Sequence, residues 1–169
     1  AFGTLIGEIT VSRIDLCVDF STLVDIAAVS PSAWVTRATH KAQYWDGDVP
    51  SGWTIGKGDL LARLYDKTIE IRKSGKSYLE ATWKVLGWDE VSPVWRLELQ
   101  YRREVLAQLG TTSLPEVLER LASLWHYGTT SWLRPAEPNP DDQTKSRWPT
   151  HRLWMALSAV PWHGQQEAS

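Results

Sequence analysis

The sequence is poor in cysteine, in long apolar runs and in net charge. Cys17 is the one cysteine among 169 residues, which excludes an internal disulfide and a cysteine-based zinc site and fits a reducing compartment. No run approaches the ~20 apolar residues that a membrane-spanning helix needs, and the amino terminus lacks the pattern of a signal peptide. We therefore expect a cytoplasmic location and no membrane partner.

The formal net charge of −2 gives no global positive field that would favour nucleic acid. The distribution is uneven, because residues 57–84 hold seven basic and four acidic side chains, a local net charge of +3. Such a basic stretch suffices to engage phosphates on a domain that is otherwise near neutral. The four histidines lie far apart without metal-ligand spacing, which argues against a histidine-ligated metal.

The length predicts one domain with a full core. Eleven tryptophans are an unusually large number, and we expect most of them in the core, with a minority available to stack on bases. The predicted elements run as strands, helix, hairpin, strand and helices. This order indicates an α+β fold with an antiparallel sheet and helices packed on one face.

Three stretches alternate apolar and functional side chains with the period of a β-strand. They cover residues 12–20, 60–67 and 95–102. If these strands share one antiparallel sheet, their polar sides form one surface, which is our candidate active site. The residues of that surface are Arg13, Asp15, Cys17, Asp19, Leu61, Arg63, Tyr65, Lys67, Arg96, Glu98, Gln100 and Arg102.

Asp15, Asp19 and Glu98 supply the carboxylate oxygens that Mg²⁺ and Mn²⁺ prefer. The alternative is that each carboxylate forms an ion pair on the same face, Asp15 with Arg13 and Glu98 with Arg96. The sequence leaves both readings open.

Tyr65 lies between two cations in the stretch Arg-Leu-Tyr-Asp-Lys at 63–67. A free tyrosine has a pKa of about 10, so a tyrosine nucleophile needs a nearby positive charge to favour the phenolate. Arg63 and Lys67 are placed to supply that charge and to hold a phosphate. Tyrosines in strands more often serve packing, and this alternative also remains.

The ordered set of motifs resembles the replication initiation factor family, the trans-acting rolling-circle initiators of plasmids and phages. The resemblance covers most of the chain and rests on Arg-Ile-Asp-Leu-Cys-Val-Asp at 13–19, Thr-Ile-Gly-Lys-Gly at 54–58, Arg-Leu-Tyr-Asp-Lys at 63–67 and Trp-Arg-Leu-Glu-Leu-Gln at 95–100. Trp132-Leu-Arg and residues 146–151 also resemble the carboxyl-terminal part of phage members.

This resemblance implies a DNA nicking domain that uses a divalent metal, Mg²⁺ or Mn²⁺. It implies that Tyr65 is the nucleophile and that Asp15 or Asp19, together with Glu98, binds the metal. Arg63 and Lys67 would hold the scissile phosphate, and the DNA backbone would contact Arg72, Lys73, Lys76 and Arg96.

The expected organisation is a catalytic nicking domain over residues 1–134 and a carboxyl-terminal extension over 135–169 packed on the same domain. The start at Ala1 indicates a piece of a longer protein. The expected partners are origin DNA, single-stranded or in a hairpin, a host helicase and a second copy of the chain. The alternatives are a non-catalytic DNA-binding regulator on the same fold and a tryptophan-rich protein-interaction domain.

Overall fold

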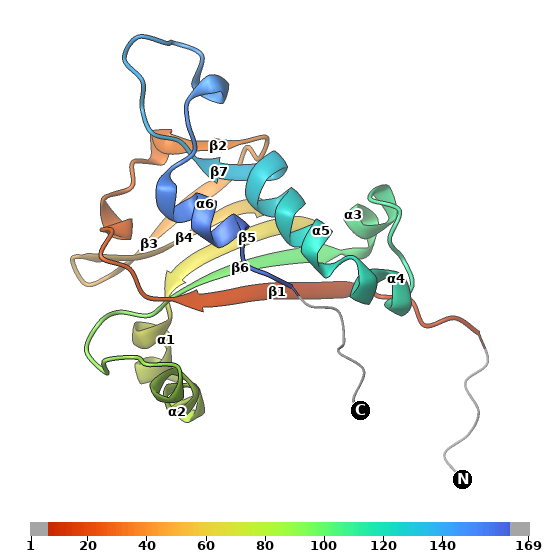
Figure 1. The fold of residues 1–169 in the computed structure, drawn as a ribbon, viewed down its shortest axis with the longest axis horizontal. Helices are drawn as coiled ribbons and strands as arrows, with labels where there is room; N and C mark the ends of the chain where they lie inside the picture. Colours follow the sequence, from red (N-terminus) through yellow and green to blue (C-terminus); the bar gives the residue numbers. More distant parts are fainter. Residues whose placement is uncertain (1–6, 163–169) are drawn as a thin grey trace.

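The core of the fold is an antiparallel sheet, seen here in a computed structural model that describes residues 7–162 (Figure 1). Within that range the sheet has five strands in the order β1-β6-β5-β4-β3, and every neighbouring pair is antiparallel. Their bounds are β1 Arg13–Phe20, β3 Lys41–Asp46, β4 Val49–Lys57, β5 Leu60–Asp66 and β6 Trp95–Arg102. The α+β prediction is confirmed.

The period-two alternation of the sequence sets the two faces of this sheet. In β5, Leu60, Ala62 and Leu64 are buried, whereas Arg63 and Tyr65 are partly exposed. The three predicted strands are adjacent, because β6 pairs with β1 on one side and with β5 on the other. Their polar sides therefore lie on one face of the sheet, as predicted, although Gln100 is buried there.

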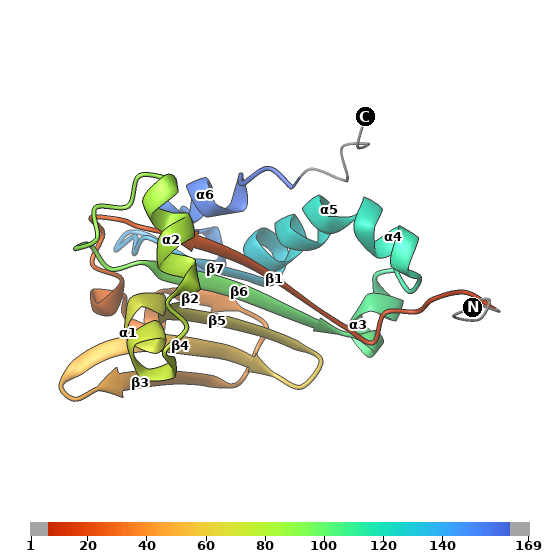
Figure 2. The same ribbon diagram turned by 90° about the horizontal axis from the view of Figure 1, so that it is seen from below.

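The apolar face of the sheet is covered by the carboxyl-terminal half of the chain. Figure 2 shows α4 (Leu114–Glu119), α5 (Leu121–His126) and α6 (Arg152–Ser158) on the same side of the sheet. Between them lie the π-helix η3 (Tyr127–Trp132) and β7 (Leu133–Pro135), which pairs with β2 (Trp34–Thr36). No helix in residues 7–162 has the length and apolarity to cross a membrane.

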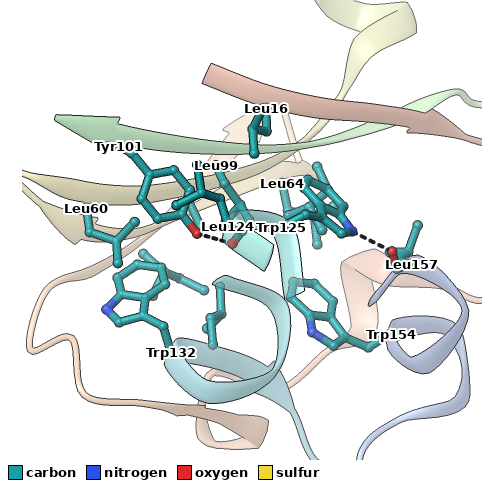
Figure 3. Close-up of a cluster of buried hydrophobic side chains, with 14 of the residues drawn as sticks. Leu16, Leu60, Leu64, Leu99, Tyr101, Leu124, Trp125, Trp132, Trp154 and Leu157 are labelled. Atoms are coloured by element: carbon teal, nitrogen blue, oxygen red, sulfur yellow. Dashed lines mark hydrogen bonds between the residues drawn. The ribbon is translucent and has the colours of Figure 1, made fainter. Parts of the chain in front are cut away.

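Tryptophans and one tyrosine join these helices to the sheet (Figure 3). The Tyr101 hydroxyl donates to the carbonyl of Leu124 at 2.6 Å, and Trp125 Nε1 donates to the carbonyl of Leu157 at 2.8 Å. Tyr101 and Trp125 thus bury a large area and satisfy their polar atoms. The core placement of most tryptophans is confirmed, and the buried ones are Trp34, Trp53, Trp83, Trp95, Trp125, Trp132 and Trp154.

The capping box at Ser113 and Glu116 starts a helix as the spacing predicts. The helical spacing of the apolar residues Val117, Leu118, Leu121, Leu124 and Trp125 predicts one continuous helix, but Arg120 interrupts it and separates α4 from α5. The remaining elements within the described range are short: η1 Ile26–Ala28, η2 Pro31–Ala33, α3 Arg103–Gln108 and η4 Lys145–Arg147.

Helices α1 (Lys67–Ser74) and α2 (Tyr78–Val85) lie near the end of the sheet where β5 ends (Figures 1 and 2). The Asp66 side chain caps α1 by accepting from the Ile69 backbone N–H at 3.0 Å. Gly75 ends α1 in the left-handed conformation, with φ of +71°. The chain therefore turns from strand to helix one residue after Tyr65, which brings a basic helix beside that tyrosine.

Candidate active site

One row of side chains crosses the polar face of the sheet at the end next to α1. Strand register places Asp19 of β1 opposite Arg96 of β6, and Arg96 opposite Tyr65 of β5. The row continues to Gly52 of β4 and Tyr44 of β3. Side chains directly opposite each other in a sheet lie about 5 Å apart at Cβ. The structure thus brings together Tyr65, a cation and a carboxylate from three strands.

Arg96 is held in a fixed orientation by Asp19. Its Nε and Nη2 atoms donate to the two carboxylate oxygens of Asp19 at 2.6 and 2.8 Å. Trp83 Nε1 of α2 donates to the same carboxylate at 3.0 Å. The side chain of Arg96 is 16% exposed and that of Asp19 18%, so this two-point pair is shielded from water and more rigid than a surface ion pair. The hydrogen bonds that Arg96 donates to Asp19 raise the pKa of Arg96, which keeps the guanidinium charged.

The other two candidate carboxylates are also paired with arginines. Glu98 accepts from Arg63 Nη1 at 2.7 Å, and Asp15 accepts from Arg13 Nε at 2.8 Å. The ion-pair alternative is therefore correct for Asp15 and Arg13. It named the wrong partner for Glu98, because the β5–β6 register sets Arg63 opposite Glu98, whereas Arg96 faces Asp19.

These carboxylates have suitable donor chemistry for Mg²⁺ or Mn²⁺ but not the arrangement of a metal site. Within residues 7–162 no group of three or more His, Cys, Asp or Glu side chains is placed to hold a metal ion. Asp19 already accepts hydrogen bonds from two residues on its two oxygens. By themselves, without phosphate ligands, these side chains do not form a metal site.

Tyr65 is more resistant to ionisation than the sequence suggested. The pKa of Tyr65 is raised to about 12, mainly by burial and secondly by the negative charge of Glu98. The positive charge of Arg96 acts in the opposite direction and lowers this pKa. The two cations expected to lower this pKa are occupied, since Arg63 pairs with Glu98 and Lys67 pairs with Glu70. Arg96 is the cation that opposes this rise in the pKa of Tyr65, and only the pairing of the strands reveals it.

The expectation that Lys67 continues the polar face of the β5 strand is wrong. Lys67 is the first residue of α1 rather than the last of β5, and its side chain is 7% exposed. Its ammonium lies 5.6 Å from the centre of the Tyr65 ring and pairs with Glu70. Lys67 therefore supports the ring of Tyr65 by a cation–π contact.

We expect Tyr65 to ionise near pH 12 in the folded protein. In a difference ultraviolet titration of wild type against Tyr65→Phe, the Tyr65 component should be absent near pH 10 and should appear around the raised pKa of about 12. The unfolded chain releases this proton near pH 10. Because the folded state binds the proton more tightly, the free energy of unfolding should fall as pH rises from about 10 towards 12. Ionisation of Tyr65 at or below pH 10 would contradict the role assigned to burial.

A hollow of about 420 Å³ opens beside Tyr65. It is bounded by the sheet on one side and by α1 on the other. Its lining residues are Tyr44, Ser51, Gly52, Tyr65, Asp66, Ile69, Glu70, Lys73 and Ser74. The candidate nucleophile thus faces a space large enough for part of a substrate.

The predicted backbone-contacting cations lie on the exposed side of α1 and just beyond it. Arg72, Lys73 and Lys76 are all exposed, and Lys73 pairs with Asp46 at the tip of the β3–β4 hairpin at 2.7 Å. An exposed basic helix next to the hollow suits contact with phosphates. Arg96 differs from these three, because it is largely buried and tied to Asp19.

Three residues of the site were not expected from the sequence. Trp83 belongs to α2 and reaches Asp19 from 64 positions away, and Tyr44 and Gly52 join the row through β3 and β4. The composition of residues 45–52 predicts a turn, with Tyr44 just before it and Gly52 at its end, so only the observed β3–β4 pairing could place these two residues in the row. The amphipathic spacing of α2 was the one available signal for Trp83.

The chain has the fold of a rolling-circle replication initiator. The similar solved structure is the rolling circle replication initiator protein from Geobacillus stearothermophilus, with a TM-score of 0.59 and 15% sequence identity. The match covers 93% of this chain and 59% of that one, so this chain spans little more than half of the matched structure. No family model and no curated protein matches the chain.

Proposed function

We propose that this chain is a nicking domain of a rolling-circle replication initiator, in which Tyr65 attacks a phosphodiester of single-stranded origin DNA. One observation carries the proposal. Tyr65 stands at the mouth of a hollow, next to an arginine that Asp19 fixes at two points, on the open face of a sheet with the initiator fold.

The reaction is an exchange of one phosphodiester for another. The Tyr65 oxygen forms a bond to phosphorus, and the bond from phosphorus to the 3′-oxygen breaks. The products are a 5′-phosphotyrosyl link and a 3′-hydroxyl, which takes up a proton from solvent and can prime synthesis. Since bond energy is retained in the phosphotyrosine, strand transfer can later reverse the step without a nucleotide cofactor.

Arg96 has the position to stabilise the charge that develops on the phosphate. Asp19 engages one N–H each on Nε and Nη2, so both N–H groups of Nη1 and the second N–H of Nη2 are left to donate to a phosphate oxygen. Asp19 is then a positioning residue that sets the direction of these donors. Because this orientation exists before substrate binds, little reorganisation is needed in the transition state.

The phenolic proton needs an acceptor, because the pKa of Tyr65 is about 12. Glu98 is the diagonal neighbour of Tyr65 on β6, and its charge acts on that tyrosine. The pair with Arg63 uses Oε1 of Glu98, which leaves Oε2 as the candidate base. Arg63 would thus hold the general base, Glu98, in position instead of binding the phosphate itself.

The exposed cations Arg72, Lys73 and Lys76 would contact the DNA backbone and add affinity that falls with salt concentration. We retain Mg²⁺ or Mn²⁺ as a predicted cofactor that DNA would help to bind, since substrate phosphates commonly complete such sites. Strand displacement after nicking requires a helicase, and we expect one as a partner, together with a second copy of the chain.

The test is adduct formation on labelled single-stranded origin candidates, with Mn²⁺ or with EDTA, followed on denaturing gels. Wild type should give a protease-sensitive shifted band, and Tyr65→Phe should give none, because the substitution removes the attacking oxygen alone. An adduct that persists in Tyr65→Phe would exclude Tyr65 as the nucleophile. Loss of the wild-type adduct in EDTA would establish the metal requirement.

A second candidate is a DNA-binding regulator without catalysis. The observation that favours it is the pairing of all three candidate carboxylates with arginines, together with the raised pKa of Tyr65. It predicts origin binding that EDTA leaves unchanged and no covalent adduct from folded wild-type protein. The same gels therefore separate the two functions.

A further inference from the structure

Two tyrosines face each other across a glycine on the polar face of the sheet. Tyr44 of β3 and Tyr65 of β5 are both register partners of Gly52 on the strand between them. Two strand spacings, about 10 Å, therefore separate the tyrosine backbones. Both side chains line the hollow beside α1, and Gly52 forms part of its floor.

Gly52 leaves this floor free of a side chain. A Cβ at position 52 would lie 2.8 Å from the Leu64 carbonyl oxygen and 2.8 Å from Tyr65 Cβ. The close approach of β4 to β5 thus requires glycine, and the gap between the two aromatic rings follows from it. Tyr44 itself is 51% exposed although it is a large aromatic residue. An exposed aromatic ring at the wall of a hollow provides a stacking surface.

The charges around the gap disfavour a phosphate inside it. Asp66 and Glu70 contribute carboxylates to the lining, and the one lysine, Lys73, is paired with Asp46. The exposed cations Arg72 and Lys76 lie outside the lining residues. A neutral planar group fits the gap better than an anion does, while the backbone attached to it can follow the basic surface of α1.

We propose that the gap between Tyr44 and Tyr65 above Gly52 binds one nucleobase of single-stranded DNA, stacked on the ring of Tyr44. This inference deepens the proposed function and rests on it for the position of that base, which is next to the phosphate that Tyr65 attacks. A nucleobase bound there would fix the direction in which the DNA strand crosses the sheet, along the row of residues from Tyr44 to Arg96. Double-stranded DNA is excluded from this site, because a paired base cannot enter the gap.

The test compares an oligothymidylate with a strand of the same length that carries abasic residues throughout. Fluorescence anisotropy at fixed salt measures the affinity of each strand. Wild type should bind the base-bearing strand more tightly, and Tyr44→Ala should weaken that binding about tenfold while leaving the abasic strand unaffected. Tyr44→Phe keeps the ring and should restore the wild-type preference.

Tyr78→Ala is the matched control, because Tyr78 is 69% exposed and lies outside the hollow. It should not change the preference for the base-bearing strand. An equal loss on both strands in Tyr44→Ala, or no loss on either, would overturn the base site. The binding assay involves no cleavage, so this failure is distinct from absence of the Tyr65 adduct, which would overturn the nicking proposal alone.

Discussion

Arg96→Ala is expected to slow formation of the Tyr65–DNA adduct by a factor on the order of 100 to 1,000, the usual cost of losing one preorganised donor in a transition state. Arg96 is the register partner of Tyr65 and is fixed by Asp19 at 2.6 and 2.8 Å. Single-turnover adduct formation at saturating DNA measures the effect on the chemical step. Affinity for single-stranded DNA should change far less, because the exposed cations on α1 remain.

The substitution also leaves the shielded carboxylate of Asp19 without its cation, which destabilises the fold. Arg96→Ala combined with Asp19→Ala removes both charges and should recover part of the lost stability in urea unfolding. The double variant should stay as slow as the single variant in adduct formation. This difference separates the catalytic contribution of Arg96 from its structural one.

Arg63→Ala is the matched control on the same face, where Arg63 pairs with Glu98. It should have a smaller effect than Arg96→Ala, since Arg63 acts on the phenolic proton through Glu98 and not on the phosphate. Equal rates in wild type and Arg96→Ala would contradict the assignment of Arg96 to transition-state stabilisation.

Gly128→Ala is expected to lower the free energy of unfolding by about 3 kcal/mol through overpacking of the core. A Cβ at position 128 would overlap the Tyr101 hydroxyl and lie 2.5 Å from Leu99 Cδ1. Both neighbours are fully buried on β6, and Tyr101 is further held by its hydrogen bond to Leu124. The π-helix η3 would have to move off the sheet to make room. Urea unfolding followed by tryptophan fluorescence measures the change.

Gly110→Ala is the comparison for this prediction. Gly110 has φ of +67°, and its nearest neighbour would be Arg120 Nη1 at 3.9 Å. Gly110→Ala should therefore lower the free energy of unfolding by about 1 kcal/mol, through backbone strain alone. If Gly128→Ala is as stable as Gly110→Ala, η3 can shift without loss of packing. That result would contradict the prediction that the contact of Gly128 with Tyr101 and Leu99 leaves no room for a Cβ.

The local pattern of the sequence was sufficient to predict β1, β5 and β6 and, apart from Lys67, the faces of these three strands. Period-two alternation placed Tyr65, Arg96 and Glu98 on one polar side, and the capping box marked the start of α4. Both signals depend on neighbours within a few residues, so they can be read without knowing the fold. The resemblance in motif order pointed to the same fold that the structural comparison shows.

Which charges pair was decided by the tertiary structure alone. Arg96 and Asp19 are 77 positions apart, and Arg63 and Glu98 are 35 apart. Alternation fixes the face on which each side chain lies, but strand order and register determine what stands opposite it. The same long-range pairing set Tyr65 beside Glu98 and placed Tyr44 across Gly52. The sequence therefore determined the chemistry available on the surface, and the pairing of distant strands determined which groups act on one another.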